Sequence, residues 1–191
     1  MFYSPENRQG LKHNPFKAIV APRPIGWIST RGPLGDNLAP YSFFNAISDT
    51  PMQVMFAGGH KDSIRNVQSS GVFAVNLVSH ALLAQMNASS AALPLGVDEF
   101  AVADVQKAEC ETIACPRVAQ APASLECRAL QVLDLKGGDL MVIGEVIGIH
   151  IDPQFLQNGR FDTAAAQLTA RLGYRDYAVI DRIFELARPQ D

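Results

Sequence analysis

Two long segments of alternating apolar and polar residues, joined by a Gly-Gly-Asp turn, constrain the fold of this chain most strongly. They are Ser124 to Lys136 (SLECRALQVLDLK) and Leu140 to Ile151 (LMVIGEVIGIHI). Alternation with a period of two is typical of β-strands that have one buried face, and Gly137 and Gly138 suit a tight turn. We therefore predict a long β-hairpin in the second half of the chain.

Shorter apolar runs, each bounded by Gly, Pro, Asn or Asp, predict further strands in the first half. With the hairpin they make about six strands. Strands and helices do not alternate regularly, which favours an antiparallel barrel over a doubly wound sheet. The predicted shorter strands are Ile25 to Thr30, Leu38 to Phe44, Met52 to Ala57 and Val72 to Val78.

Helices are expected to be few and peripheral. The region from Ser90 to Pro122 contains several prolines and little periodicity, so we predict that it wraps around the barrel. Capping residues and apolar spacing mark the helix candidates. These run from Asp62 or Ser63 to about Ser69 before Gly71, from Ser79 through Leu82, Leu83 and Met86, and from Asp162 to Thr169.

Composition indicates one folded domain that spans residues 1–191. The chain is 48% hydrophobic and 18% charged, which argues against disorder. Its net charge is -3 and it has no basic block, so nucleic acid is not an expected partner. No apolar run approaches the roughly 18 to 20 residues that cross a bilayer, and the first residues lack a signal-peptide pattern. We therefore expect a cytoplasmic protein without a membrane partner.

The three cysteines, Cys110, Cys115 and Cys127, are an odd number and fit reduced thiols better than a disulfide framework. Cys110 and Cys115 enclose four residues, but no histidine lies near them in the sequence to complete a metal site. A redox sensor built on these two thiols is a third, weaker interpretation, and it requires them to be exposed with a low pKa.

Small, hydroxyl and amide residues are interleaved with aromatic residues from Asn37 to Ala46 (NLAPYSFFNA). Such a mixture can hydrogen-bond the polar edge of a planar ring and cover its faces. Downstream, Lys61, Asp62 and Ser63 follow a Gly-Gly pair at the start of a predicted helix, where free N–H groups, a hydroxyl and a cation suit a phosphate. The pattern indicates a flavin site.

These segments resemble the flavin reductase-like proteins of the FMN-binding split-barrel fold, from about Pro22 to about Tyr177. The resemblance implies a mainly β, six-stranded antiparallel Greek-key split barrel with a few peripheral helices, which forms a homodimer and binds FMN near the subunit interface. The segments that carry it, in order, are PRPIGWIST, NLAPYSFFNA, HKDS, MNASS, GEVIGIHID and RLGYRDY.

The resemblance also implies which residues contact the cofactor. Main-chain groups from Ser42 to Ala46 would face the flavin ring, Asn45 would approach the phosphate, and Lys61, Asp62 and Ser63 would bind it. The other implied cofactor-binding residues are Ser29, Thr30, Asn37, Phe43, Phe44, Asn87, Ser89, Ser90, His150, Arg171 and Tyr174.

Each of these assignments has a structural alternative. Ser29 and Thr30 can simply end a strand, and Lys61 can lie at a solvated helix start. A lone histidine such as His150 among apolar neighbours is usually a hydrogen-bonded structural residue. For Arg171 and Tyr174, plain surface packing competes with a flavin-covering or dimer role, and Trp27 is best explained as a core residue.

The resemblance implies an enzyme that transfers hydride from NAD(P)H to flavin and supplies a partner oxygenase or another acceptor. The chain has no Rossmann or Walker motif, so NAD(P)H would bind by stacking or through loops. It also has no marked acid–base set, which hydride transfer to flavin does not require. A flavin-binding electron carrier or storage protein without NAD(P)H turnover is the open alternative.

Overall fold

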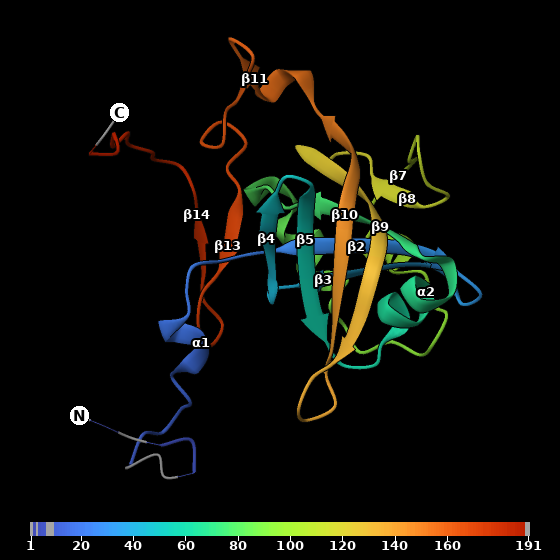
Figure 1. The fold of residues 1–191 in the computed structure, drawn as a ribbon, viewed down its shortest axis with the longest axis horizontal. Coiled ribbons are helices and arrows are strands. Elements are labelled where there is room, and N and C mark those ends of the chain that lie inside the picture. The colour runs from blue at the N-terminus through green and yellow to red at the C-terminus, as the bar shows by residue number, and fades with distance from the viewer. Residues whose placement is uncertain (1, 3, 7–9, 190–191) are drawn as a thin grey trace.

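A curled antiparallel sheet forms the body of the protein in the computed structural model, which describes residues 2, 4–6 and 10–189 (Figure 1). The order of its seven strands is β3-β2-β6-β9-β10-β5-β4, and every neighbouring pair is antiparallel. They are Gly26–Gly32 (β2), Gly35–Tyr41 (β3), Phe44–Asp49 (β4), Met52–Gly58 (β5), Val72–Leu77 (β6), Ala123–Asp134 (β9) and Leu140–Ile151 (β10).

The predicted long hairpin is confirmed as β9 and β10. Its turn contains Gly137 and Gly138, both at positive φ, a backbone conformation that glycine adopts readily. Two irregularities interrupt the pairing of β10 with β9, between Ile143 and Gly144 and between Val146 and Gly148. Bulges of this kind increase the local twist, which helps a sheet to curl.

The sheet has seven strands where the sequence predicts about six. The predicted strand from Leu38 to Phe44 corresponds mainly to β3, and the additional strand β4 begins at Phe44, where the predicted strand ends. The chain leaves β3 after Tyr41 and begins β4 at Phe44. β3 pairs with β2, whereas β4 pairs with β5, so the two strands form opposite edges of the sheet. Local hydrophobicity is continuous across this step and does not reveal the change of partner.

Apolar side chains fill the space inside the curled sheet. The aromatic rings of Tyr41 and Phe56 meet edge to face at 4.8 Å, and those of Phe56 and Phe73 at 5.2 Å. Tyr41 belongs to the edge strand β3, and Phe56 belongs to β5, which is the neighbour of the opposite edge strand β4. This contact therefore brings the two sides of the sheet together across the interior. The sheet is therefore a barrel with a core of its own.

A second core lies outside the sheet, between β2 and the segment of residues 78–121. Trp27 is completely buried there, with Met86 and Phe100 packed in the same cluster. Its neighbour Ile28 points into the barrel, so β2 is buried on both faces. The predictions that Trp27 is a core residue and that the Pro-rich region wraps the barrel are confirmed.

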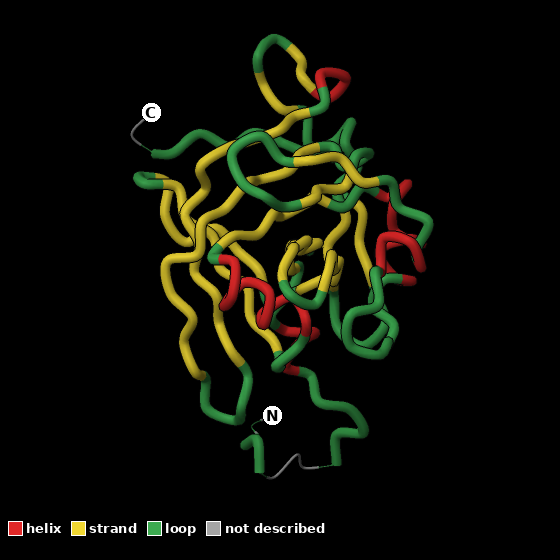
Figure 2. The backbone as a smooth tube through the Cα atoms, turned by 90° about the vertical axis from the view of Figure 1, so that its right-hand side faces the viewer, coloured by secondary structure: helices red, strands yellow, loops and turns green. Residues whose placement is uncertain are grey.

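Helices are short and loops and strands dominate, as the tube drawing shows (Figure 2). The first predicted helix is present, with Lys61 as its N-cap and Gly71, in the left-handed conformation, at its end. The second is a 3₁₀ turn that continues into an α-helix. The helices are Phe16–Ile19 (α1), Asp62–Ser70 (α2), His80–Leu82 (η1, 3₁₀), Leu83–Ala88 (α3), Glu99–Val102 (α4) and Pro153–Phe155 (η2, 3₁₀).

The predicted third helix, Asp162 to Thr169, is wrong. Asp162 starts a helical turn, in which its carboxylate accepts a hydrogen bond from Ala165 N at 2.9 Å. The turn stops because Leu168 forms a β-bridge with Ser79 and Thr169 begins a strand. Tertiary pairing therefore overrides the local helical preference.

Three small sheets complete the fold, and none of the helices in the described part of the chain is long and apolar enough to cross a membrane. The N-terminal arm, here residues 10–22, and the sheet β1-β13-β14 lie together on one side of the barrel (Figure 1). The remaining strands are Arg23–Pro24 (β1), Lys107–Glu109 (β7), Pro116–Val118 (β8), Leu156–Gln157 (β11), Arg160–Phe161 (β12), Thr169–Arg171 (β13) and Tyr177–Val179 (β14).

Candidate functional site

A cavity of about 490 Å³, here called the larger cavity, lies where β3 ends and α2 begins. This volume is within the range of small-molecule and cofactor sites. Its wall combines the predicted phosphate-binding turn with the predicted ring-binding segment. The predicted residues that line it are Asn37, Ser42, Phe43, Lys61, Asp62, Ser63, Ser89 and Ser90.

The start of α2 presents groups that suit a phosphate. Lys61 is exposed, lines the larger cavity and makes no ion pair with the described carboxylates. No side chain caps the helix, so its first N–H groups keep their hydrogen-bonding capacity. A cation beside uncapped N–H groups is a favourable environment for a phosphate.

A buried polar network fixes the wall behind this turn. Asn37 Nδ2 donates to both carboxylate oxygens of Glu99 at 2.9 Å, and Ser63 Oγ donates to Asn37 Oδ1. Leu38 N donates to Glu99 at 3.0 Å. Burial, together with the nearby carboxylate of Asp62, raises the pKa of Glu99 above its ordinary value. Asn37 and Ser63 are thereby held in fixed positions by the protein itself.

Tyr41 is a polar group in this wall that the protein leaves unsatisfied. Its hydroxyl is buried near Ser63, and no hydrogen bond of normal geometry joins it to a described residue. Burial raises the pKa of Tyr41 to about 12, so the hydroxyl stays protonated. A buried unpaired donor at a cavity wall is a place where a polar ligand gains a hydrogen bond.

The larger cavity fits FMN on these observations. Lys61 and the N–H groups of α2 suit the phosphate, Tyr41 and Ser42 offer polar contacts, and Phe43 offers an aromatic face. Two buried carboxylates also line the cavity, but Glu99 is satisfied by Asn37 and Leu38, and Asp62 accepts a hydrogen bond from Gly96 N at 2.9 Å. Each is therefore engaged by the protein.

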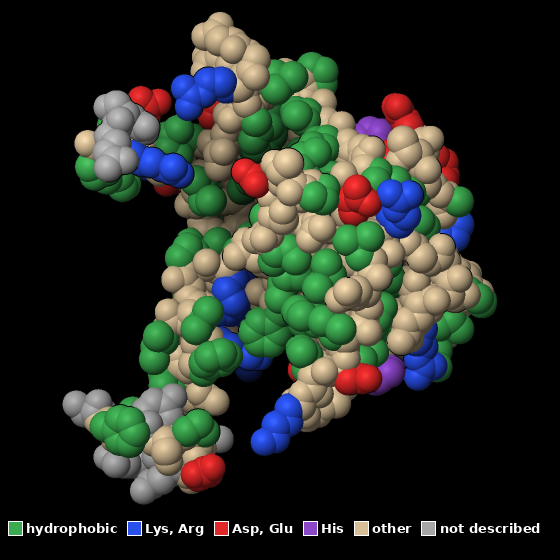
Figure 3. All heavy atoms as spheres, in the orientation of Figure 1, with side chains coloured by type: hydrophobic (Ala, Val, Ile, Leu, Met, Phe, Trp, Pro, Cys, Tyr) green, Lys and Arg blue, Asp and Glu red, His purple; other side chains and the backbone are tan. Residues whose placement is uncertain are grey.

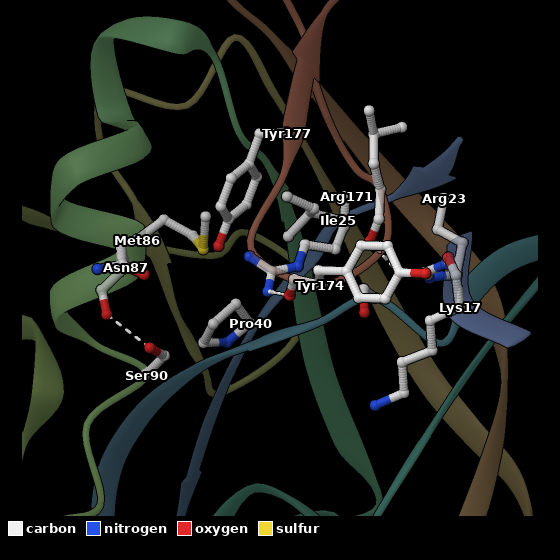
Figure 4. Close-up of a pocket in the computed structure, with 12 residues that line it drawn as sticks. Lys17, Arg23, Ile25, Pro40, Met86, Asn87, Ser90, Arg171, Tyr174 and Tyr177 are labelled. Carbon is white, nitrogen blue, oxygen red and sulfur yellow. Dashed lines mark hydrogen bonds between the residues drawn. The ribbon is translucent and has the colours of Figure 1, made fainter. Parts of the chain in front are cut away.

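Figure 4 shows the residues that line a second cavity of about 300 Å³, here called the arginine cavity. The two share Lys17, Pro40, Ser42 and Ser90 in their walls. Of the predicted residues, Asn87, Arg171 and Tyr174 line only this cavity. The predicted residues therefore line two cavities, which meet at Ser42.

Ser29 and Thr30 line neither cavity. Both side chains are completely buried, and each has a partner within the protein. Ser29 Oγ donates to Pro116 O at 2.7 Å, and Thr30 Oγ1 accepts from Asn66 Nδ2 at 3.2 Å. Their side chains therefore stabilise the packing around β2, which corresponds to the structural alternative.

Phe44, Asn45 and Ala46 also lie outside both cavities. Phe44 is buried in the barrel core, while Asn45 and Ala46 are exposed on the edge strand β4. Asn45 Oδ1 accepts a hydrogen bond from Ala46 N at 3.0 Å. The chain alone does not bring Asn45 to the turn at Lys61, so its phosphate contact stays a prediction.

His150 pairs with a buried glutamate instead of lining a cavity. His150 Nε2 lies 2.5 Å from Glu126 Oε1, and Glu126 also accepts hydrogen bonds from Glu111 N and Thr112 N, each at 2.7 Å. The pair ties the turn between β7 and β8 to the long hairpin. This pairing agrees with a hydrogen-bonded structural role for His150, and its flavin contact stays a prediction.

The Glu126 network makes stability depend on pH. Burial opposes ionisation of Glu126, but hydrogen bonds from Thr112, Glu111 N and His150 outweigh it and lower the pKa to about 2. Stability from a carboxylate with a lowered pKa is present above its ordinary pKa of about 4 and is lost as the pH falls towards the folded value.

In urea unfolding at pH 6 and pH 3, Glu126→Gln should lose less stability on acidification than the wild type. The exposed Glu185→Gln is the control, and equal losses in all three proteins would contradict the assignment.

The cysteines do not form a redox sensor of the kind considered above. Cys115 is completely buried, and its hydrogen bond with Cys110 and its burial both raise the pKa of its thiol. A raised pKa and a buried sulfur are the opposite of what a reactive thiolate requires. The described residues also contain no group of three or more His, Cys, Asp or Glu that is placed to hold a metal.

Several residues that line the two cavities were not among the site residues predicted from the sequence. Lys17 comes from the N-terminal arm and Glu99 from the region of little periodicity, and neither stands in a recognisable pattern. Arg23 and Tyr177 lie inside the PRPIGWIST and RLGYRDY segments, so their neighbourhood marks them. Tyr41 likewise lies within NLAPYSFFNA.

Comparison with known proteins decides the family. Residues 20–165 match the family model described as a flavin reductase like domain. The chain belongs to the flavin reductase like family. An uncharacterized protein of Deinococcus radiodurans is 40% identical over 195 residues, which cover 94% of this chain and 86% of that protein. Membership of this family supports flavin binding and an oxidoreductase function.

Solved structures of flavin reductase like and related proteins share the fold. Nitrilotriacetate monooxygenase component B from Bacillus cereus is 26% identical with a TM-score of 0.89, covering 97% of this chain and 98% of that one. The 2-nitrobenzoate 2-nitroreductase of Pseudomonas fluorescens is 26% identical with a TM-score of 0.85, covering 91% and 88%. A split-barrel protein from Shewanella frigidimarina has a TM-score of 0.85 at 19% identity, covering 98% and 99%. The mainly β split barrel is therefore confirmed.

Proposed function

We propose that this protein is an NAD(P)H:FMN oxidoreductase that binds FMN in the larger cavity. It transfers hydride from a reduced nicotinamide nucleotide to the flavin. The reduced flavin then supplies a partner oxygenase or another acceptor. One observation carries the proposal. The cation and uncapped N–H groups at the start of α2 and the polar and aromatic wall from Tyr41 to Phe43 line a single cavity of about 490 Å³. Membership of the flavin reductase like family supports this reading of the cavity.

The protein's own residues would bind and position the reactants. Lys61 and the start of α2 hold the phosphate, and the network of Asn37, Glu99 and Ser63 keeps the adjoining wall rigid. Bound FMN supplies a two-electron acceptor, so no side chain has to serve as an acid or base in the hydride step. Water exclusion and alignment are the remaining contributions of the chain.

Two relatives support the proposed fate of the electrons. The similar Bacillus cereus protein is a component of a monooxygenase, and the similar Pseudomonas fluorescens protein is a nitroreductase. The first supports delivery to a partner oxygenase, and the second supports reduction of a small acceptor. NAD(P)H is the proposed electron source in both cases.

The supply of NAD(P)H in the cytoplasm, together with three free cysteines, supports a cytoplasmic location.

Steady-state oxidation of NADH and NADPH, assayed with and without added FMN, tests the proposed activity. We expect oxidation that requires FMN and proceeds with one or both nucleotides. Protein that carries FMN but oxidises neither nucleotide would contradict the proposal and would favour a flavin carrier. Protein that does not bind FMN would contradict both readings.

His150→Ala should leave hydride transfer largely intact. Loss of a true general acid or base costs about 10² to 10⁴-fold in rate, whereas His150 pairs with Glu126 outside both cavities. We expect a decrease of less than a hundred-fold in the rate of flavin reduction, measured by stopped flow in FMN-saturated protein. A thousand-fold decrease with FMN still bound would show a catalytic role for His150.

The protein is also proposed to be a homodimer that completes the flavin site. Large apolar residues are exposed on β4, β5 and β10, among them Ile47, Met52 and Ile149 at 47–48%. Green side chains gather on this face of the barrel beside a hollow (Figure 3). Exposed apolar area of this extent marks interaction surfaces.

Light scattering at micromolar concentration should therefore give the mass of a dimer. An Ile149→Asp variant should shift the mass towards that of a monomer, because a charge on an apolar interface must be desolvated. The control is Val102→Asp, at a site on α4 that is 49% exposed and lines neither cavity. A flavin-loaded monomer of the wild-type protein would contradict the proposal.

A further inference from the structure

The arginine cavity is lined by cations without any acidic residue. Lys17, Arg23 and Arg171 are in its wall, and no Asp or Glu is (Figure 4). None of the three forms an ion pair with a carboxylate among residues 2, 4–6 and 10–189. The larger cavity, by contrast, contains the carboxylates of Asp62 and Glu99. Positive charge in the arginine cavity is therefore left uncompensated by the protein.

Arg23 is a built part of this cavity. Arg23 is only 6% exposed, and its guanidinium donates hydrogen bonds to the backbone carbonyls of Lys17, Val20 and Leu172. Its Nε is buried and has no acceptor in the described part of the chain. An unpaired donor on a buried cation costs free energy unless a ligand satisfies it.

The two guanidinium groups also act on each other. Burial, and then the charge of Arg171, lower the pKa of Arg23 from its ordinary value. Two like charges held close together in a partly buried space repel each other. An anion between or beside them would relieve the repulsion and gain charge-assisted hydrogen bonds.

Arg171 is oriented before any ligand arrives. Its Nη2 donates to Tyr174 O at 2.7 Å, and its guanidinium lies 4.3 Å from the centre of the Tyr177 ring. Tyr174 has a φ of 55°, which is unusual for an aromatic residue, so this turn is held by its surroundings. At Gly173 an added Cβ would meet Ala18 Cβ at 2.4 Å, which shows how closely the N-terminal arm packs on the turn.

The rest of the wall suits a small planar group. Ile25, Pro40, Met86 and Tyr177 supply apolar and aromatic surface beside the cations. A volume of about 300 Å³ is at the lower end of ligand sites, enough for one ring with its substituents rather than a whole dinucleotide. A guanidinium presents paired N–H donors that match the two oxygens of a carboxylate.

We propose that the arginine cavity binds a small aromatic carboxylate, whose carboxylate lies against Arg23 and Arg171 and whose ring faces the larger cavity. The inference rests on the proposed flavin site, because it makes this carboxylate the second ligand of the flavin enzyme. The shared walls at Lys17, Pro40, Ser42 and Ser90 place the two ligands next to each other.

Calorimetric titration of the flavin-free protein with benzoate tests the proposal without relying on activity. Benzoate should bind, and its neutral analogue benzamide should bind about ten-fold or more weakly, since charge-assisted contacts contribute about 1.5 kcal/mol or more. Arg171→Gln should weaken benzoate by about ten-fold or more. Arg175→Gln removes the same charge from an exposed position nearby and should have little effect.

The possible outcomes separate the ligand classes. Binding of inorganic pyrophosphate but not of benzoate would overturn the aromatic carboxylate. Benzoate binding that is the same in Arg171→Gln would overturn the site. If Arg171→Gln weakens FMN strongly but not riboflavin, the cavity holds the flavin's own phosphate, which also overturns the proposal. Failure to bind FMN would instead contradict the proposed function, and the benzoate titration would still stand as a separate result.

Discussion

Replacing Trp27 with Ala should lower the free energy of unfolding by about 3 to 5 kcal/mol, the cost typical of deleting a large buried aromatic side chain. Trp27 is completely buried in the core outside the barrel, in a cluster with Met86 and Phe100. Its Nε1 also donates to Ser89 Oγ at 2.9 Å, so the same residue supports a wall of the larger cavity. Chemical denaturation followed by circular dichroism measures the change.

Trp27→Phe is the matched control for this prediction. It keeps most of the buried ring but removes the hydrogen bond to Ser89, which is worth about 0.5 to 1.5 kcal/mol. The Phe variant should therefore be much more stable than the Ala variant. If Trp27→Ala costs less than about 1 kcal/mol, the packing of residues 78–121 on β2 does not contribute as described.

Replacing Lys61 with Ala should weaken FMN by about ten-fold or more and should leave riboflavin almost unchanged. Lys61 lies at the uncapped start of α2, and a charge-assisted contact with a phosphate contributes about 1.5 to 3 kcal/mol. Riboflavin lacks the phosphate, so it should not report the loss of the cation. Quenching of flavin fluorescence measures both affinities.

Two further variants make the Lys61 experiment specific. Lys61→Arg keeps the positive charge and should retain most of the FMN affinity. Lys136→Ala removes a lysine from the exposed end of the long hairpin, outside both cavities, and should change neither affinity. Equal weakening of FMN and riboflavin by Lys61→Ala would contradict the phosphate assignment.

The sequence predicted those parts of the fold that depend on local pattern. The β9–β10 hairpin is visible in period-2 alternation, and α2 is visible between its polar start and Gly71. The division of the strand after Tyr41 was not predicted, since it depends on which strands β3 and β4 pair with. The helix expected from Asp162 failed for a related reason, because Leu168 and Thr169 pair with distant segments.

The candidate site shows the same limit. The polar start of α2 and the segment around Ser42 are each a continuous stretch of sequence, so each can be recognised by itself. The structure places both in the wall of one cavity. Glu99 and Lys17 join them through long-range packing, which no local pattern encodes. The side chains of Ser29, Thr30 and His150 are hydrogen-bonded within the protein and line neither cavity, and the sequence did not reveal these partners.

Titration of the purified protein with FMN, followed by visible absorption and by flavin fluorescence, tests the central claim most directly. We predict saturable binding of one FMN per chain, with tighter binding of FMN than of riboflavin because of the phosphate contacts at the start of α2. Protein that binds no FMN at micromolar concentration, or that binds riboflavin as tightly as FMN, would contradict a flavin site in the larger cavity.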